Sequence, residues 1–302
     1  MKRFAIFTAI VGGYDIINQP NTIDSEFDYI LFSNDIQEKQ IGVWQIRNIP
    51  YSNNDKTRVA RWVKTHPEKL LADYQASVWM DAALVINTDI VYQRIIELFD
   101  NDVPVSSMWH AYRDCAYDEA VEVALLGLEH ENTVIDWMHF LVKDHYPEHQ
   151  GLFETNVVYR KHTNPQVHKL DSLWWNCIEK YSRRDQLSFN YSLWKLGINC
   201  PFFFVPNENA RNSAHIHCTT SHVDTNKAWR FVTRNKKEDQ LIYYYNKAHS
   251  GRINRTRIKR LYKLAYHFSS PRIIIISLAL FYRIASSLCS YKRQGMQKQQ
   301  TS

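Results

Sequence analysis

The sequence lacks the short motifs that would assign an enzyme class directly. It has no GxGxxG turn and no GxxxxGK[ST] loop, which argues against a dinucleotide-dependent dehydrogenase or a P-loop enzyme. It has no GxSxG and no HExxH, so the usual hydrolase signatures are missing as well. Internal repeats and low-complexity tracts are also absent. The function must therefore be inferred from the order of elements and the placement of polar residues.

Cysteine pairs and long apolar runs are missing too. The five cysteines are scattered, odd in number and form no CxxC pair, which argues against a zinc site or a disulfide scaffold. Reduced thiols in a cytoplasm are the simplest interpretation. The run near the C-terminus, residues 273–282, covers ten residues and is apolar except for Ser277. A membrane-spanning helix needs about 20.

What the sequence does contain is typical of a soluble globular enzyme. Hydrophobic residues make up 45% of the 302 residues and charged residues 23%, so a sizeable core can form. Aromatic residues reach 14%, which fits either a cleft that stacks sugar rings or a base, or a large aromatic core. The net charge of +6 is uneven, because residues 252–263 hold six basic residues and no acid. This concentration in the tail argues against a nucleic-acid-binding face across the domain.

Strands and helices are expected to alternate along the first 200 residues. The apolar start, residues 4–15, is interpreted as a buried strand and not as a signal peptide, because it ends in Gly-Gly-Tyr-Asp. This order predicts an α/β fold with a mostly parallel sheet. Further strands are predicted at 27–35, 43–50, 76–87, 104–110, 153–162 and 200–206, and helices at 55–73, 88–99, 117–131, 134–143, 167–181 and 185–196.

The chain is divided into a catalytic domain, residues 1–249, and a C-terminal helical segment, residues 250–302. In that segment Ser269-Ser270-Pro271 starts a short apolar helix after the basic stretch. A basic segment followed by a short apolar helix fits a location on a membrane surface. The alternative is a helix that packs on the protein's own core or on a second subunit.

Polar residues gather where several predicted strands end. The first strand leads to Asp15, the second to Asn34 and Asp35, and the fourth contains Asp81. Ligands of open α/β sheets bind beyond the carboxyl ends of the strands, and grouped acids are costly unless they bind something. Asp81 follows a buried strand and could hold a divalent cation, Mn²⁺ or Mg²⁺, against a diphosphate, or could cap the next helix. Cationic side chains could neutralise the diphosphate instead; the candidates are Arg58, Arg61 and Lys64.

Six segments in order make the chain resemble a glycosyltransferase-like family long catalogued as a domain of unknown function, whose plant members act in cell-wall and mucilage polysaccharide synthesis. They are AIVGGYD, DYILFSND, the basic helix KTRVARWVKTHPEKLL with ASVWMDAALVIN, HAYRDCAYDEA, FETNVVYRKH and RDQLSFNYSLWKLG, within about residues 4–210. The resemblance implies a GT-A type fold, a nucleotide-binding sheet with an acceptor-side lobe.

The resemblance also implies a set of site residues. It places Asp81 at the metal or diphosphate position, and Glu154 or Asp185 as the base or the orienting group for an acceptor hydroxyl. In the HxxRDCxYDEA motif it marks Arg113, Asp114 and Glu119. Donor binding is implied for Gly12, Tyr14, Asp15, Asp35, Arg58, Lys64, Arg113, Asn156 and Gln186. The alternative for Asp185 is a helix cap, and for Glu119 a solvated helix residue.

One departure from the wider GT-A pattern is clear. Related transferases often have Asp-x-Asp at this position, whereas this chain has Asp81-Ala82-Ala83, so the second acid is missing. A histidine of the segment HIHCTTSH, above all His217, could complete a metal site with Asp81. A surface or core histidine is the alternative.

The function expected from these patterns is transfer of a sugar from a nucleoside-diphosphate sugar to a glycan or glycolipid acceptor. With no plant-like N-terminal anchor, a bacterial surface-polysaccharide or lipopolysaccharide pathway is expected, in the cytoplasm or at the inner face of the cytoplasmic membrane. The alternative is a non-catalytic glycan- or nucleotide-binding protein on the same fold, which the missing second acid supports.

Overall fold

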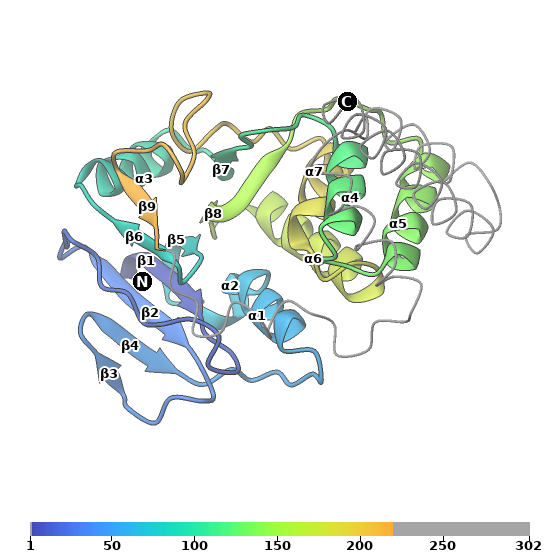
Figure 1. Ribbon diagram of the computed structural model, residues 1–302. Helices are drawn as coiled ribbons and strands as arrows, with labels where there is room; N and C mark the ends of the chain where they lie inside the picture. Colours follow the sequence, from blue (N-terminus) through green and yellow to red (C-terminus); the bar gives the residue numbers. More distant parts are fainter. Residues whose placement is uncertain (1, 220–302) are drawn as a thin grey trace, which may run out of the picture. The chain divides into compact units, whose positions relative to one another are not determined.

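The computed structural model describes residues 2–219, which are drawn in colour in Figure 1. The chain divides into two compact units, one made of residues 1–116 and 149–228 and the other of residues 117–148 and 229–302. The C-terminal segment predicted at residues 250–302 lies outside the described residues, as does His222. Between residues 2 and 219, no helix is long and apolar enough to cross a membrane.

The first unit is built on a seven-stranded sheet. Its strands lie in the order β3-β4-β2-β1-β5-β8-β7. Strands β4, β2, β1 and β5 pair in parallel, and β7 shares their direction because both β5 and β7 are antiparallel to β8. The mostly parallel α/β sheet predicted from the sequence is thus confirmed. The strand bounds are β1 Lys2–Ala9, β2 Phe27–Phe32, β3 Gln40–Ile41, β4 Trp44–Arg47, β5 Tyr74–Met80, β7 Val105–Trp109 and β8 Phe153–Lys161.

Both faces of the sheet are buried, so its central strands are apolar on both sides. Along β1, Ala5 and Phe7 pack with α1 (Lys56–Lys64), α6 (Pro165–Lys180) and α7 (Asp185–Leu196). Phe4 and Ile6 point to the other face and pack with α3 (Ile90–Asp100). The alternation of side chains along a strand therefore gives two hydrophobic cores, one on each face.

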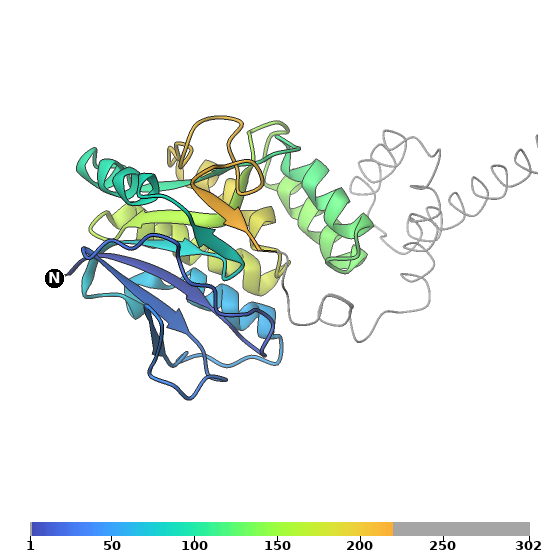
Figure 2. The same cartoon turned by 60° about the vertical axis from the view of Figure 1, so that its left-hand side comes forward.

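A small second sheet lies over the second of these cores. It pairs β6 (Leu84–Ile86) with β9 (Ile216–Cys218) in antiparallel fashion, so two segments about 130 residues apart in sequence run side by side (Figure 2). Ile86 and Ile216, which face each other in this pair, belong to the core on the α3 face. The segment that follows Asp81 is thereby fixed to the end of the described chain.

The second unit contributes α4 (Ala116–Leu125) and α5 (Glu131–Lys143) to the described residues. Tyr117 and Tyr146 join the two ends of this region, because the Tyr117 hydroxyl donates to the Tyr146 carbonyl over 2.7 Å. Glu119, which the resemblance marked, lies on α4 and is buried.

Three predicted elements differ from the structure. The single strand predicted at 76–87 is two strands, because the chain turns at Asp81 and the Leu84 N–H donates to the Asp81 carbonyl over 2.8 Å. The helix predicted at 55–73 ends at Lys64, and α2 (Pro67–Leu70) follows separately. The strand predicted at 200–206 is an isolated bridge between Phe202 and Ser107. Prolines at both ends of that segment, Pro201 and Pro206, have no N–H to donate to a longer ladder.

Candidate active site

The order of the strands marks one edge of the sheet as the place for a ligand. From β1 the chain continues to β2 on one side, and β5 lies on the other side of β1. The crevice beyond the carboxyl ends of β1 and β5 is such a switch point, where open α/β sheets bind their ligands. Asp15 follows β1 and Asp81 follows β5 directly, and Asp35 comes after β2. The acids that the sequence predicted for one edge are therefore at that edge.

Asp81 sits in the turn after β5 and is held from two sides. Its backbone N–H donates to the Asn156 carbonyl over 2.9 Å, and its Oδ1 accepts the indole N–H of Trp79 over 2.7 Å. The Lys64 ammonium lies 3.7 Å from the same Oδ1. The Asp81 side chain keeps 38% exposure, so its other oxygen can still meet a ligand.

Beneath Asp81 lies a buried ionic cluster that joins α1 to α7. Asp185 Oδ2 is 2.5 Å from the Lys64 ammonium and accepts the Thr155 hydroxyl over 2.8 Å, while Oδ1 is 2.9 Å from Arg61 Nε. Trp79 and Trp174 enclose the Lys64 ammonium, with ring centroids at 5.3 and 5.7 Å. The side chains of Lys64 and Asp185 are 1% and 5% exposed, so the pair is shielded from water.

The charges in this cluster set one another's protonation. Burial alone would raise the pKa of Asp185, but Arg61 and Lys64 more than offset it and hold the pKa well below its usual range. Burial lowers the pKa of Lys64, and Asp185 and Asp81 oppose that shift. Asp185 is therefore a stable carboxylate, and both of its oxygens are already engaged.

The residues predicted for donor binding fall into two groups. On the β1 and β2 side, the Gly12 N–H donates to Asp35 Oδ2 over 2.5 Å, with Gly12 in the left-handed region at φ 76°. Tyr14 and Asp15 follow, both half-buried, and Asp15 is electrostatically coupled to Arg61. Arg58, in contrast, is engaged at the start of α1, where it pairs with Asp55 over 2.9 Å.

The first residues of β8 and the turn after β7 form the other side of the edge. Glu154 and Asn156 lie on β8, and Asn156 Nδ2 donates to Glu154 Oε2 over 3.1 Å. The pairing of β7 with β8 jumps from Ser107–Val158 to Met108–Glu154, a bulge of the kind found next to active sites. The Arg113 N–H donates to His110 Nδ1 over 3.0 Å in the turn after β7. Gln186, half-buried, follows Asp185 on α7.

The predicted metal partner of Asp81 has another neighbour. His217 is exposed on β9, and its Nδ1 lies 2.8 Å from Asn87 Oδ1. In the described part of the chain no group of three or more His, Cys, Asp or Glu side chains could hold a metal ion. The Asp81 oxygen that faces Lys64 already has a cation beside it. These residues do not by themselves make a metal site.

A family model described as "TOD1/MUCI70, glycosyltransferase-like domain" matches residues 1–222. The chain belongs to this family. The resemblance found in the six sequence segments is thus confirmed. No curated protein matches the chain.

Several solved glycosyltransferase structures are similar to the chain. The galactosyltransferase LgtC, solved with donor and acceptor sugar analogs, is 10% identical at a TM-score of 0.41, over 85% of this chain and 99% of LgtC. The bifunctional glycosyltransferase WbbM is 10% identical at 0.36, over 66% of this chain and 38% of WbbM. Mouse xyloside xylosyltransferase 1 is 10% identical at 0.34, over 65% of this chain and 81% of that enzyme.

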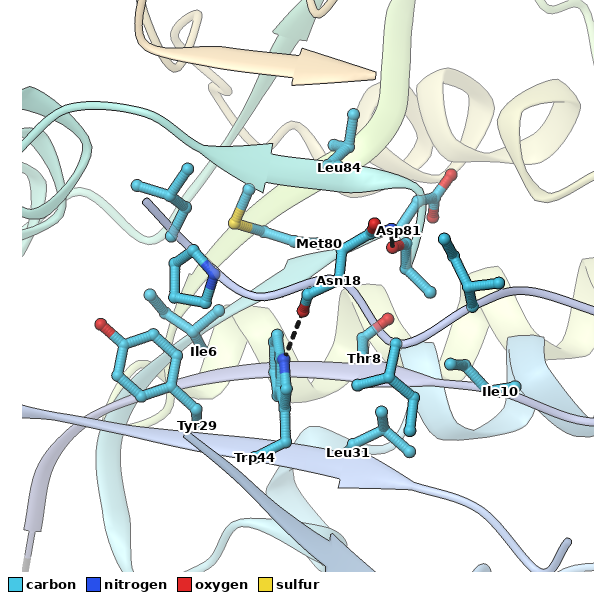
Figure 3. A pocket seen from close by; sticks show the side chains of 15 residues that line it. Ile6, Thr8, Ile10, Asn18, Tyr29, Leu31, Trp44, Met80, Asp81 and Leu84 are labelled. Carbon is cyan, nitrogen blue, oxygen red and sulfur yellow. Dashed lines mark hydrogen bonds between the residues drawn. The ribbon is translucent and has the colours of Figure 1, made fainter. Parts of the chain in front are cut away.

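A pocket opens beside Asp81 on the α3 face of the sheet (Figure 3). It is lined mostly by apolar side chains and is open to solvent, and its enclosed space is small. Asn18 crosses it. Its backbone carbonyl accepts the Trp44 indole N–H over 2.7 Å, and its side-chain amide donates to the Ala82 carbonyl over 2.8 Å. The Thr8 hydroxyl is buried in its wall and has no hydrogen-bond partner within residues 2–219.

Two members of the site were not predicted from the sequence. Arg211 binds Glu154 through a hydrogen-bonded ion pair, from a loop 57 residues further along the chain. Cys218 on β9 is exposed and is electrostatically coupled to Asp81, Arg211, Asp15 and Glu154. Neither residue lies in a recognisable motif. The place of Cys218 depends on the pairing of β6 with β9, which a three-residue strand does not reveal in advance.

Proposed function

We propose that this protein is a glycosyltransferase that moves a sugar, as a hexosyltransferase does, from a nucleoside-diphosphate sugar to a glycan or glycolipid acceptor. Surface polysaccharide or lipopolysaccharide synthesis is the process we propose for it. The observation that carries the proposal is Asp81, half-exposed at the switch point and backed by the Lys64–Asp185–Arg61 cluster. Membership of a glycosyltransferase-like family supports the same reaction class.

Arg61 supplies positive charge where a leaving diphosphate would gain negative charge, and the Asp81 carboxylate supplies negative charge where the sugar ring would become oxocarbenium-like. Preorganised charges in a site shielded from water stabilise such a transition state without reorganising. Arg61, with 16% side-chain exposure, is the cation of the cluster that solvent reaches, and it is coupled to Asp81 and Asp15. We infer that Asp81 and Arg61 contact the donor, whereas Lys64 and Asp185 hold them in position.

Divalent metal ions are expected for many enzymes of this kind, and Mn²⁺ or Mg²⁺ was the expectation here. Because no group of three possible metal ligands is found among residues 2–219, and Lys64 lies beside Asp81, no step of the proposal passes through a metal ion. Binding of each donor measured with Mn²⁺ and with EDTA decides whether a cation contributes.

A membrane-surface location is a further part of the proposal. It rests on the sequence of residues 250–302, with six basic residues at 252–263 and a short apolar run after them. It places the enzyme at the inner face of the cytoplasmic membrane. Co-sedimentation of the full chain with anionic vesicles, but not with neutral vesicles, is the expected result. Equal absence from both pellets would contradict it.

The test of the catalytic proposal compares two aspartates at opposite ends of β5. Asp81→Asn keeps the size of the side chain and removes its charge at the site. Asp73→Asn makes the same change at an exposed position just before the strand. A panel of nucleotide sugars is screened by thermal shift, since a ligand of the folded state raises its stability. The nucleotide sugar that gives the largest thermal shift is then used to measure transfer of its sugar and hydrolysis of the donor by water.

The proposal predicts that one donor raises the melting temperature of the wild type. It predicts that Asp81→Asn lowers turnover by about 10²-fold or more, the usual loss when a charge-stabilising group is removed, while Asp73→Asn stays near wild type. A wild type that binds a donor but never turns it over would favour the non-catalytic binding protein. If no donor raises the melting temperature even at high concentration, that result would count against both the transferase and the non-catalytic binding protein.

A further inference from the structure

We propose that Tyr112, Arg211 and Glu154 form the subsite for a sugar ring of the acceptor. The ring lies on Tyr112, and one of its hydroxyls replaces Arg211 at Glu154. This inference rests on the proposed function, because it assigns the second substrate of the same reaction to the β7–β8 side of the sheet edge.

Glu154 is placed to meet a hydroxyl close to Asp81. The two residues are linked through Asn156, whose carbonyl accepts the Asp81 N–H and whose amide donates to Glu154 Oε2. The Glu154 side chain is 5% exposed. An unpaired carboxylate at that depth would be costly, so its second oxygen, Oε1, needs a donor at all times. In the free protein that donor is Arg211.

Arg211 differs from the partners of Asp185 in that it can leave. Its side chain is 54% exposed, whereas Lys64 and Arg61 are 1% and 16% exposed. An exposed guanidinium regains water when it moves away, and the incoming hydroxyl takes its place as a hydrogen-bond donor to Glu154. Its backbone is fixed, because the Arg211 N–H donates to Asn209 Oδ1 over 2.9 Å and Asn209 is buried. Of Glu154 and Asp185, Glu154 is therefore the carboxylate that a substrate hydroxyl can reach.

Tyr112 presents an aromatic face beside this pair. Tyr112 is 67% exposed, and the Arg211 guanidinium carbon lies 5.4 Å from the centroid of the Tyr112 ring. The turn beneath it is rigid, since the N–H groups of Tyr112 and Arg113 both donate to His110 Nδ1 over 3.2 and 3.0 Å. A fixed and exposed ring next to a carboxylate and a guanidinium matches a pyranose, which has an apolar C–H face and a polar rim.

The position of this group completes a row along the edge of the sheet. Asp81 ends β5, Asn156 and Glu154 follow on β8, and Tyr112 follows the end of β7. Asp15 and Asp35 lie on the other side of Asp81, after β1 and β2. A donor held between β1 and β5 would thus meet an acceptor held between β8 and β7 at Asp81.

The experiment measures acceptor and donor binding separately. The probes are the methyl glycosides of glucose, galactose, mannose and N-acetylglucosamine at 50 mM, observed by saturation-transfer NMR on the full chain, with donor binding followed by thermal shift. Tyr112→Ala removes the ring, and Tyr112→Phe keeps it. Val205→Ala, a change at another exposed apolar residue, is the control for lost surface area.

The expected result is binding of at least one glycoside to the wild type, weakened about tenfold by Tyr112→Ala, within the range for an aromatic contact. Tyr112→Phe and Val205→Ala should bind like the wild type. All four proteins should keep the donor shift and their melting temperatures. Glycoside binding that Tyr112→Ala leaves unchanged, or no glycoside binding to the wild type, overturns the subsite. Loss of the donor shift in the wild type would instead contradict the proposed function.

Discussion

At the scale of single residues, Lys64 is the least expected feature of the site. The sequence places it on a basic helix, where a solvated lysine would be ordinary. The structure buries it between two carboxylates and two indole rings. A buried ammonium is retained only with close partners, because taking an ion out of water costs several kcal/mol. We infer that this lysine fixes the geometry of Asp81.

Replacing Lys64 with Met should therefore be strongly destabilising. The change leaves Asp185 with Arg61 and Thr155 and removes the cation beside Asp81. Breaking a buried pair by removing one partner costs about 3–5 kcal/mol. Urea denaturation should show that loss for Lys64→Met and almost none for Lys69→Met, since Lys69 is exposed on α2. Equal stability of the two variants would show that the Lys64 pair contributes nothing.

Glu154 and Asp185 were predicted as a pair of candidates for one role, and the contacts distinguish them. Both side chains are nearly buried, at 5% exposure each. Asp185 is bound by buried cations, whereas the partner of Glu154 is exposed. The sequence could not separate these cases, since the partners lie 121 and 57 residues away. Both residues remain predictions as catalytic groups.

At the scale of elements, the predictions succeeded where a pattern is long. Strand β2 and helices α6 and α7 have several apolar residues at regular spacing, and each was predicted within a few residues. Strands β3 and β9 have two and three residues, too few to show a period. The break after β5 was missed because Ala82 and Ala83 continue an apolar run without glycine or proline.

Helix α1 carries Arg58, Arg61 and Lys64, so its start controls the alignment of the site. Asp55 caps it: its Oδ1 accepts the Thr57 N–H over 3.0 Å, and its carboxylate pairs with Arg58 and Arg183. Asp55→Ala should lower the free energy of unfolding by about 1–2 kcal/mol, the usual effect of losing an N-cap. Chemical denaturation measures this, with Asp73→Ala as the matched control. A loss of unfolding free energy below about 0.5 kcal/mol would mean that packing alone determines where the helix begins.

At the scale of the whole molecule, the mostly parallel sheet is what made the gathering of acids at one edge predictable. Parallel strands end at one edge, so acids after β1, β2 and β5 must meet there. The acceptor side joins strand β8, which runs the opposite way, to a loop near residue 211. That meeting depends on the path of the entire chain, and local sequence patterns contain no information about it.

Three buried histidines should make the folded protein sensitive to acid. Burial lowers the pKa of His66, His110 and His162 to about 4 each. In the unfolded chain a histidine titrates near 6.5. Between these values the unfolded chain binds protons that the folded protein does not, so stability rises with pH across the window. It is lost as the pH falls from about 6.5 towards 4.

His110 allows this to be tested at one position. The imidazole Nδ1 accepts the N–H groups of Tyr112 and Arg113, and an asparagine Oδ1 can accept them without titrating. His110→Asn should therefore reduce the loss of unfolding free energy between pH 6.5 and 4 by up to about 3 kcal/mol, at about 1.4 kcal/mol per pKa unit. Urea denaturation at several pH values measures it. His145→Asn, at an exposed position with positive φ that asparagine tolerates, should leave the pH dependence unchanged. Parallel curves for wild type and His110→Asn would show that folding does not lower the pKa of His110.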